Sequence, residues 1–378
     1  MRKSVMQKET MENDAVNRLT ISHLSYIWLL SLLTIITLLV KQVQAENLAY
    51  VPQDKQMVIF TYNKQGETKP DIGELQVLSH LYQRSQLPGQ SYLITEIQAR
   101  LNFFLSYYPA SAESEFLQAS LYQRQHKFAR AQAILQKLVK QQAGYANYGL
   151  MLANVALQQG QFKLAKDACA RLLGHAANEI TLTCMLEVES LQLDSWEGKN
   201  DQKKLNRTYQ ALLNVVQPEQ NNNIWIAQVA AEMALNVDKL QQAERWLSFY
   251  PLESMPVSAL ALWADIQLAQ TNYTYVLHTL GSLVSKTQSS DDALILRLAI
   301  AEKQLGHANL WQQKMKTLVD LRSQRNDVEH AAELAQYYLQ VAPQPQLAMQ
   351  WAQKHYELSH TAKDNQILRA AQTALWAE

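Results

Sequence analysis

The chain has 378 residues, and its 34 Lys and Arg balance 34 Asp and Glu, so the formal net charge is zero. This balance excludes the broad positive field that non-specific nucleic-acid binding needs, and it also excludes a polyacidic tail. Only 10 residues are glycine, whereas 44 are glutamine. Because glycine serves β-turns and phosphate-binding loops, this composition argues against all-β folds and nucleotide-binding α/β folds and favours helices.

An apolar run near the N-terminus predicts export. Residues 24–40 carry no charge, follow Arg18 and precede Lys41. A helix of this length spans about 25 Å, which is short for a membrane span and long for a signal peptide. Three interpretations remain open for residues 1–45: a signal peptide cleaved after the small-x-Ala sequence that ends at Ala45, an uncleaved membrane anchor at 24–40, or a buried core helix. Either of the first two places residues 46–378 beyond the membrane, in the periplasm and in an oxidising compartment.

The two cysteines of the chain are candidates for a disulfide in such a compartment. Cys169 and Cys184 lie in helical patterns on either side of the turn-like residues 174–178. In an antiparallel helix pair they would face one another, within the span of a disulfide if their Cβ atoms converge. Two free buried thiols are the alternative, and no CxxC sequence suggests redox activity.

The remaining chain is predicted to be helical after a short arm. Residues 47–63 form the one stretch that suggests extended structure, so we expect an extended arm over 46–69. From residue 70 onward, glycine and proline breaks predict helices of roughly 12 to 18 residues packed as hairpins. The polar stretch LDSWEGKNDQKKLNRT disturbs this order, and we expect an irregular insertion over 196–222.

An internal repeat of 34 residues is the decisive feature of the sequence. When the segment near Ser111 is shifted by 34 residues, small, aromatic and apolar positions coincide. The coinciding pairs are Ala119 with Ala153, Phe128 with Phe162, Ala131 with Ala165, and Leu138 with Leu172. Each copy is predicted to be a helix, a turn and a second helix, with alanines where the two helices approach closely.

The repeat resembles the tetratricopeptide repeat (TPR) family. That family places a small residue in the first helix, glycine at the turn, then an aromatic and an alanine in the second helix. The matching residues are Ala119, Tyr122, Phe128, Ala131 and Leu135 in one copy and Ala153, Gly160, Phe162, Ala165 and Cys169 in the next. The departures are Glu115 and Gly149 where the family has Trp, His126 where it has Gly, and Ala156 where it has an aromatic residue.

The resemblance implies an all-α fold, a right-handed α-solenoid of antiparallel helix pairs. We expect TPR-like repeats over 70–195 and more degenerate copies over 223–378, around Ala231, Ala264 and Ala299. The cysteine-containing run and the C-terminal run also resemble uncharacterised exported repeat proteins of Gram-negative bacteria. That resemblance bears on fold and compartment and leaves the function open.

The concave face of such a solenoid is the expected site for a protein or peptide partner. In the two clearest repeats, the groove-facing residues are mostly amide and apolar, which suits a polypeptide ligand without charge selectivity. These candidates are Phe116, Ser120, Gln123, Arg124, Asn147, Leu150, Asn154 and Gln158. Solvated helix positions are the alternative interpretation for each of them.

Catalytic and cofactor motifs are missing from the sequence. The nine histidines form no HExxH, and there is no GxxxxGK[ST] or GxSxG. We therefore expect no cofactor, no metal, no nucleic-acid partner and no enzymatic activity. The expected function is a non-enzymatic scaffold or adaptor of the bacterial cell envelope. A helical enzyme acting on peptidoglycan and a membrane-tethered structural subunit remain as alternatives, and the sequence does not define the oligomeric state.

Overall fold

The computed structural model describes residues 69–377, apart from 142–145, 194–197, 288–290 and 307–308. The leader, its apolar run at 24–40 and all of the arm before residue 69 lie outside the described residues. Among the helices that are described, none is long and apolar enough to cross a membrane.

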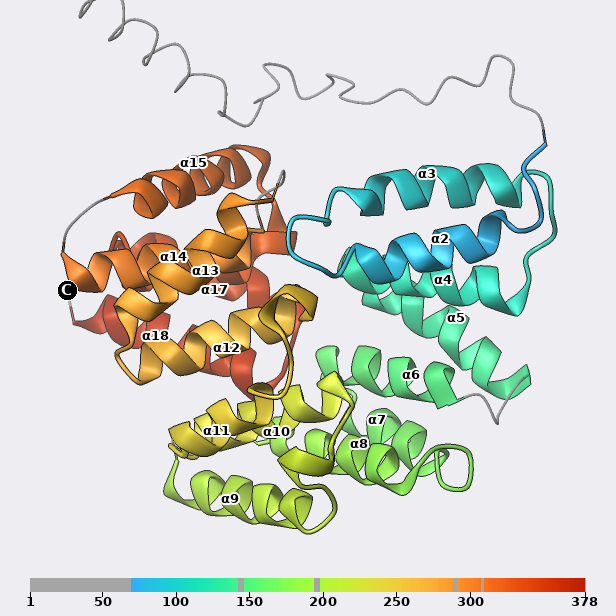
Figure 1. The fold of residues 1–378 in the computed structure, drawn as a ribbon, viewed down its shortest axis with the longest axis horizontal. Helices are drawn as coiled ribbons and strands as arrows, with labels where there is room; N and C mark the ends of the chain where they lie inside the picture. Colours follow the sequence, from blue (N-terminus) through green and yellow to red (C-terminus); the bar gives the residue numbers. More distant parts are fainter. Residues whose placement is uncertain (1–68, 142–145, 194–197, 288–290, 307–308, 378) are drawn as a thin grey trace, which may run out of the picture. The chain divides into compact units, whose positions relative to one another are not determined.

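Antiparallel helix pairs make up the described part of the chain, which contains 17 α-helices and no strand (Figure 1). The first helices of the pairs are α2 (Glu74–Arg84), α4 (Ala112–Arg124), α6 (Ala146–Gln158), α8 (Asn178–Leu191), α10 (Ile224–Asn236), α12 (Val257–Ala269), α14 (Asp292–Leu305) and α16 (Ala331–Gln340). Their partners are α3 (Leu93–Leu105), α5 (Phe128–Gln141), α7 (Phe162–Ala170), α9 (Lys199–Leu213), α11 (Leu240–Leu247), α13 (Tyr273–Ser285), α15 (Leu310–Arg325) and α17 (Pro345–Leu358). The last helix, α18 (Ala362–Trp376), has no second helix after it. This arrangement confirms the expected all-α solenoid of helix pairs.

The first helices of successive pairs form one continuous inner layer. Each of them contacts the first helix of the next pair, from α2 through α4 and onward to α18, in addition to its own partner helix. A solenoid is stabilised by such nearest-neighbour contacts, because no single pair can bury its apolar face alone. The alanines of the sequence repeat lie where helices meet: Ala119, Ala131 and Ala165 are fully buried, and Ala153 retains 1% exposure.

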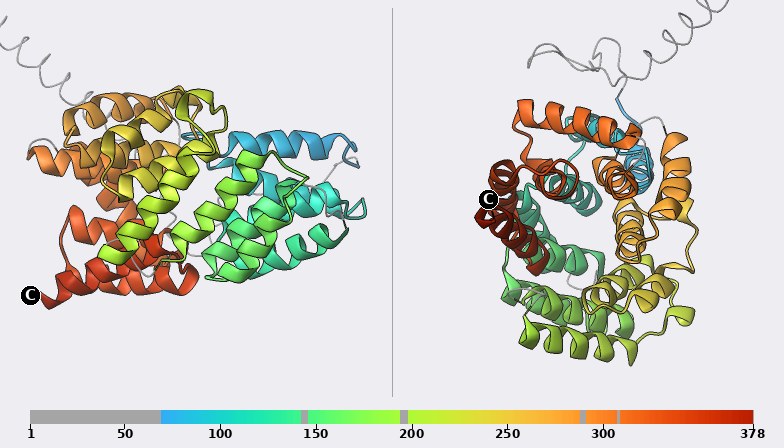
Figure 2. Two further views of the ribbon diagram at one scale, coloured as in Figure 1. Left: turned by 90° about the horizontal axis from the view of Figure 1, so that it is seen from below. Right: turned by 90° about the vertical axis from the view of Figure 1, so that its left-hand side faces the viewer.

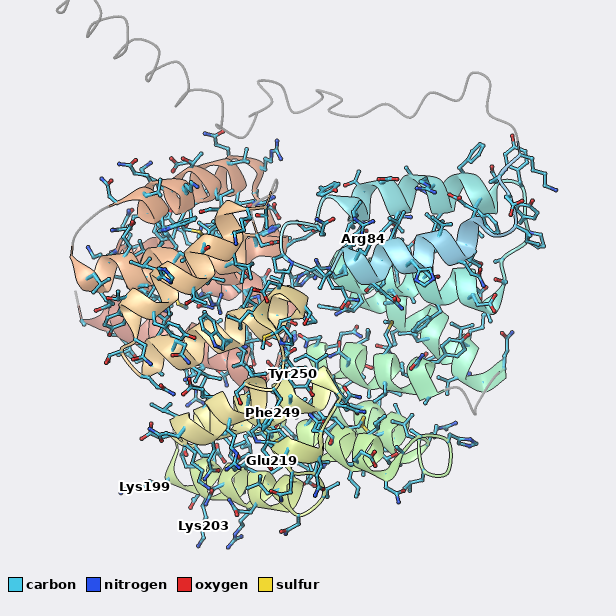
Figure 3. The ribbon with its side chains drawn as sticks, in the orientation of Figure 1. Arg84, Lys199, Lys203, Glu219, Phe249 and Tyr250 are labelled. Atoms are coloured by element: carbon cyan, nitrogen blue, oxygen red, sulfur yellow. A yellow bond between two sulfur atoms is a disulfide. The ribbon has the colours of Figure 1, made fainter. Side chains whose placement is uncertain are left out.

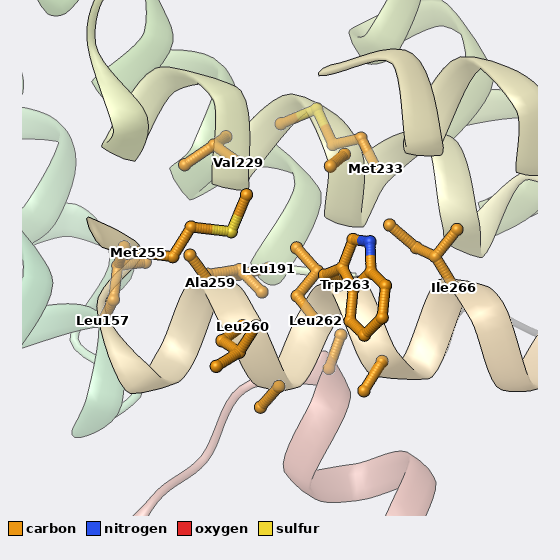
Figure 4. Packing of buried hydrophobic residues seen from close by; sticks show 14 of the residues in the cluster. Leu157, Leu191, Val229, Met233, Met255, Ala259, Leu260, Leu262, Trp263 and Ile266 are labelled. Atoms are coloured by element: carbon orange, nitrogen blue, oxygen red, sulfur yellow. The ribbon is translucent and has the colours of Figure 1, made fainter. Parts of the chain in front are cut away.

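Helix α12 shows how strongly apolar an inner helix of the array is. Ala259 to Ala264 are all buried, and Ile266 follows them. Figure 4 shows buried side chains of α12, among them Leu260 and Trp263, together with Val229 and Met233 of α10 in the same apolar cluster. A helix that contacts neighbours on both sides buries most of its faces, and Asp265 is the charged residue that α12 carries.

Residues 196–222 are not the irregular insertion expected from their polar sequence, since they contain helix α9. Leu205, Tyr209 and Leu212 are fully buried on one face of α9, and Trp246 of α11 donates a hydrogen bond to the Tyr209 hydroxyl at 3.2 Å. Lysines such as Lys203 project from the other side (Figure 3). Three apolar residues at helical spacing suffice to dock a helix whose remaining surface is charged. Short 3-10 turns follow at Pro218–Gln220, Leu252–Ser254 and Val328–His330.

Turns from distant parts of the array meet one another. The amide of Val257, at the start of α12, donates to the carbonyl of Gln86 in the α2–α3 turn at 2.8 Å. In the same turn the amide of Gly89 donates to Oδ2 of Asp291 at 2.7 Å. The C-terminal helices also return to the N-terminal pairs, since α18 contacts α8 (Figure 2). The inner face is therefore partly covered by the chain itself.

Candidate functional site

The groove predicted in the first two repeats is largely engaged within the protein. Phe116 is partly buried, and its ring lies 5.0 Å from the ring of Tyr148 on the next inner helix. Ser120 is buried, and its hydroxyl donates to the carbonyl of Phe116 at 2.8 Å. Leu150 is partly buried against the main core. These three residues pack the inner layer together, as expected where successive first helices touch.

Gln158, at the end of α6, is bound by the C-terminal part of the same chain. Its side-chain oxygen Oε1 accepts a hydrogen bond from the hydroxyl of Ser359 at 2.7 Å, and its carbonyl accepts one from the amide of His360 at 2.9 Å. A polypeptide does occupy this end of the predicted groove, and it is the turn between α17 and α18.

The other predicted groove residues differ in exposure. Arg124 and Asn147 are exposed, while Gln123 and Asn154 are partly buried. Nothing in the described contacts brings these four side chains onto a common ligand site. Their role in partner binding stays a prediction.

A recess in the C-terminal half is a second candidate site. It has a volume of about 390 Å³ and is lined by the inner helices α10, α12, α14, α16 and α18. Its lining mixes four charged residues and four amides with leucine, isoleucine and alanine side chains. The charged and amide residues are Glu232, Asn236, Asp265, Arg297, Gln336, Gln340, Lys363 and Gln366.

Two ion pairs fix the charged residues of this recess. Arg297 holds Asp265 in a bidentate arrangement, with Nε to Oδ1 and Nη2 to Oδ2 distances of 2.8 Å. Lys363 of α18 reaches Glu232 of α10, with Nζ 2.6 Å from Oε1. The negative charge of Glu232 raises the pKa of Lys363. Lys363 keeps 48% of its side chain exposed.

Glu187 of α8 interacts electrostatically with Glu232. Burial raises the pKa of the Glu187 carboxyl to about 8, the negative charge of Glu232 adds to the rise, and a hydrogen bond with the Trp225 side chain partly offsets it. Below pH 8 the carboxyl is therefore mostly protonated. At neutral pH Glu187 therefore does not add a full negative charge beside Glu232.

The sequence contained a signal for these residues. Glu232 and Asp265 directly follow the small residues Ala231 and Ala264, just as the predicted groove residue Asn154 follows Ala153. Arg297 comes 32 residues after Asp265. Extending the groove positions from the two clear repeats to the degenerate ones would have identified the acidic residues of the recess.

The two cysteines are joined in the structure. Cys169 of α7 and Cys184 of α8 form a disulfide with their Cα atoms 5.6 Å apart, and both residues are buried. The bond links the second helix of one pair to the first helix of the next. In the described ranges, no group of three or more His, Cys, Asp or Glu residues could hold a metal ion.

Comparison with known proteins gives only distant structural similarity. No family model and no curated protein matches the chain. The crystal structure of the APC/C hetero-tetramer Cut9-Hcn1 is similar with a TM-score of 0.39 and 14% identity, over 79% of this chain and 55% of that chain. The crystal structure of the P58(IPK) TPR domain is similar with a TM-score of 0.24 and 12% identity, over 80% of this chain and 99% of that chain. This chain thus spans about half the length of the first structure, and neither similarity carries a function over to it.

Proposed function

We propose that the protein is a non-enzymatic scaffold that binds a polypeptide partner in the recess formed by α10, α12, α14, α16 and α18. The observation that supports this proposal is the recess itself, because its polar side chains face an open space of about 390 Å³ instead of the core. This location differs from the groove expected in the first two repeats, where Gln158 and Ser120 are engaged by the chain itself.

The chemistry of the lining suits a peptide. Gln336, Gln340 and Gln366 each offer an amide that can both donate to and accept from a peptide backbone. The ion pairs that contain Arg297 and Lys363 can rearrange around a charged side chain of the ligand. Because the recess carries charges of both signs, recognition depends on local contacts more than on long-range steering.

We also propose that the protein works in the bacterial cell envelope, facing the periplasm. The apolar run at 24–40 supports export, and the buried disulfide between Cys169 and Cys184 suits an oxidising compartment. The mass of the mature protein shows whether the leader is cleaved after Ala45. A protein that starts at Glu46 has lost its leader, whereas a full-length protein in the membrane fraction is tethered by residues 24–40.

Site-directed photo-crosslinking in intact cells tests the binding face. A photoreactive amino acid at Gln340, on the recess, is compared with one at Gln210, an exposed residue of α9. We expect a protein adduct at Gln340 that is absent at Gln210 and disappears when Asp265 and Arg297 are both replaced by alanine. Adducts of equal yield at both positions, or none at Gln340, would contradict the proposed site.

An assay with purified protein tests the enzyme alternative. If the protein cleaves peptidoglycan, purified protein should release soluble fragments from glycan strands, and Glu187→Gln should abolish that release, because a carboxyl with a raised pKa is the group suited to a general acid. We expect no release with either protein.

A further inference from the structure

A cationic pocket lies where α7, α8 and α9 come together. Its volume is about 360 Å³, which falls within the range of about 300–1,000 Å³ that is typical of small-molecule sites. None of its lining residues belongs to the recess in the C-terminal half. The residues that give the cationic pocket its character are Lys166, Glu189, Gln192, Leu193, Lys204 and Arg207.

Helix α9 contributes one face to the cationic pocket. Lys204, Arg207 and Thr208 all line it, and their spacing of three and four positions places them together on the helix surface. Leu205 and Tyr209, the residues that follow Lys204 and Thr208, are fully buried and fix α9 to the array. The docking of α9 therefore holds two cationic side chains at the pocket, although both remain exposed to solvent.

The other two helices of the pocket are joined by the disulfide. Lys166 of α7 lies three positions before Cys169, whose bond to Cys184 links α7 to α8. Helix α8 contributes Glu189 and Gln192, which are three positions apart and lie on the same side of the helix. The covalent bond therefore fixes the relative positions of the two helices that carry Lys166 and Glu189.

The positive charges of the pocket are only weakly paired. Nζ of Lys166 lies 4.0 Å from Oε1 of Glu189, and Nζ of Lys204 lies 3.9 Å from Oδ1 of Asp201. Arg207 forms no ion pair with any residue that the structure describes. In the recess of the C-terminal half, by contrast, the two ion pairs are 2.8 and 2.6 Å long. The pocket lining carries three positive charges and one negative charge, so two positive charges are left over.

We propose that the cationic pocket binds the phosphate group of a small phosphomonoester. A phosphomonoester carries about two negative charges at pH 7, which matches the excess of positive charge in the lining. The guanidinium of Arg207 can bind two phosphate oxygens at once, and the ammonium groups of Lys166 and Lys204 add point charges. The side-chain amide of Gln192 is a further donor, and Leu193 offers an apolar surface to the carbon skeleton. The inference does not depend on the proposed polypeptide partner.

Isothermal titration of the oxidised full chain with glycerol 3-phosphate, at pH 7.5 and low salt, tests this site. We expect saturable binding. Lys166→Gln/Arg207→Gln removes two of the three cations and should raise Kd at least about tenfold. The matched control is Lys163→Gln/Lys203→Gln, which makes the same charge change on the same two helices at exposed positions outside the pocket (Figure 3). Its Kd should change little, because exposed charges outside the site are screened. Circular dichroism of both double variants checks that they are folded.

A soluble short-chain lipid separates the two sources of such a phosphate. Dihexanoyl phosphatidylglycerol, used below its micelle concentration, is a phosphodiester with one negative charge, and we expect it to bind more weakly than glycerol 3-phosphate. Tighter binding of the lipid would overturn the assignment to a phosphomonoester and indicate a lipid headgroup. The pocket itself would be overturned if glycerol 3-phosphate showed no saturable binding. Equal losses in the two double variants would also overturn it, because binding would then follow the overall charge of the protein.

Discussion

Ser359 and Gln158 lie 201 positions apart in the chain, yet the hydroxyl of one is 2.7 Å from the amide oxygen of the other. In a solenoid, contacts normally link neighbouring repeats, so a contact of this separation shows that the array turns back toward its beginning. The hydroxyl of Ser359 also lies 2.6 Å from Oδ2 of Asp364, which lies in the first turn of the last helix. The start of α18 and the end of α6 therefore share one hydrogen-bonding centre.

Replacing Gln158 by alanine should weaken the contact between the two ends of the array. The variant removes the acceptor of Ser359 while the hydroxyl keeps Asp364 as a partner, so we expect a loss of about 1 kcal/mol. Urea unfolding followed by circular dichroism measures this change. Gln353→Ala, at an exposed position of α17, is the control and should lie within about 0.5 kcal/mol of the unchanged protein. Equal midpoints for the two variants would show that the contact adds no stability.

Substitution of Asp364 should lower the free energy of unfolding more than most other substitutions at the C-terminal end. It caps α18 together with Thr361, and it also binds His355 and Ser359. Burial alone would raise the pKa of Asp364. The hydrogen bond and charge of His355 outweigh this effect, together with hydrogen bonds from the hydroxyls of Ser359 and Thr361, and lower the pKa to about 2. We expect Asp364→Ala to cost roughly 2–4 kcal/mol.

The pH dependence of Asp364 follows from the sign of that shift. A carboxyl whose folded pKa is depressed contributes stability that is fully present above its unfolded value of 3.8 and is lost as the pH falls toward 2. The midpoint temperatures of thermal unfolding of Asp364→Ala and of the unchanged protein should therefore converge as the pH falls from 3.8 to 2. Asp364→Asn keeps a capping side chain without the charge. Its midpoint temperature should lie between those of Asp364→Ala and the unchanged protein at neutral pH. A difference between Asp364→Ala and the unchanged protein that persists at pH 2 would contradict this reasoning.

The disulfide should contribute measurably to stability. Cys169 and Cys184 close a loop of 15 residues, and closing such a loop stabilises a folded chain by around 3 kcal/mol on the chain-entropy model. The double variant Cys169→Ala/Cys184→Ala leaves small apolar side chains in a buried site. We expect it to unfold at a lower urea concentration than the oxidised protein and close to that of the fully reduced protein. If oxidised protein and double variant have the same midpoint, the bond has no stabilising role.

The repeat period and the small residues at helix contacts could be predicted from the sequence because they depend on neighbours in the chain. Ala119 and Ala131 are buried in the two helices of one pair, so a pattern of 34 residues is enough to place them. Helix α9 was missed because its charged surface hides three apolar residues in an otherwise polar stretch. Leu205, Tyr209 and Leu212 have the spacing of one helix face, and that spacing was the available signal.

The return of the C-terminal helices could not be predicted from the sequence. It depends on small rotations between successive pairs that add up along the array, and no local pattern records their sum. For this reason the groove residue Gln158 was expected to face a partner, whereas it faces Ser359 of the same chain. The sequence could have indicated some residues of the recess, such as Glu232 and Asp265. It could not have indicated that they line a recess, because this depends on the position of α18.

Glu187 should make the protein less stable at alkaline pH. Its folded pKa of about 8 lies above the ordinary value of 4.5, mainly because of burial. The folded protein therefore holds a proton that the unfolded chain releases, so this contribution to stability is fully present below pH 4.5 and is lost as the pH rises through 8. Glu187→Gln, which resembles the protonated form, should remove this dependence and exceed the unchanged protein by roughly 1–3 kcal/mol above pH 8.

Urea unfolding at pH 5 and pH 9 measures this effect, since the two proteins should have similar midpoints at pH 5 and separate at pH 9. Glu189→Gln is the control, because Glu189 is exposed two residues further along α8. We expect Glu189→Gln to follow the unchanged protein at both pH values. If Glu187→Gln is no more stable than Glu189→Gln at pH 9, then Glu187 ionises normally and the polar lining beside Glu232 is open to water at neutral pH.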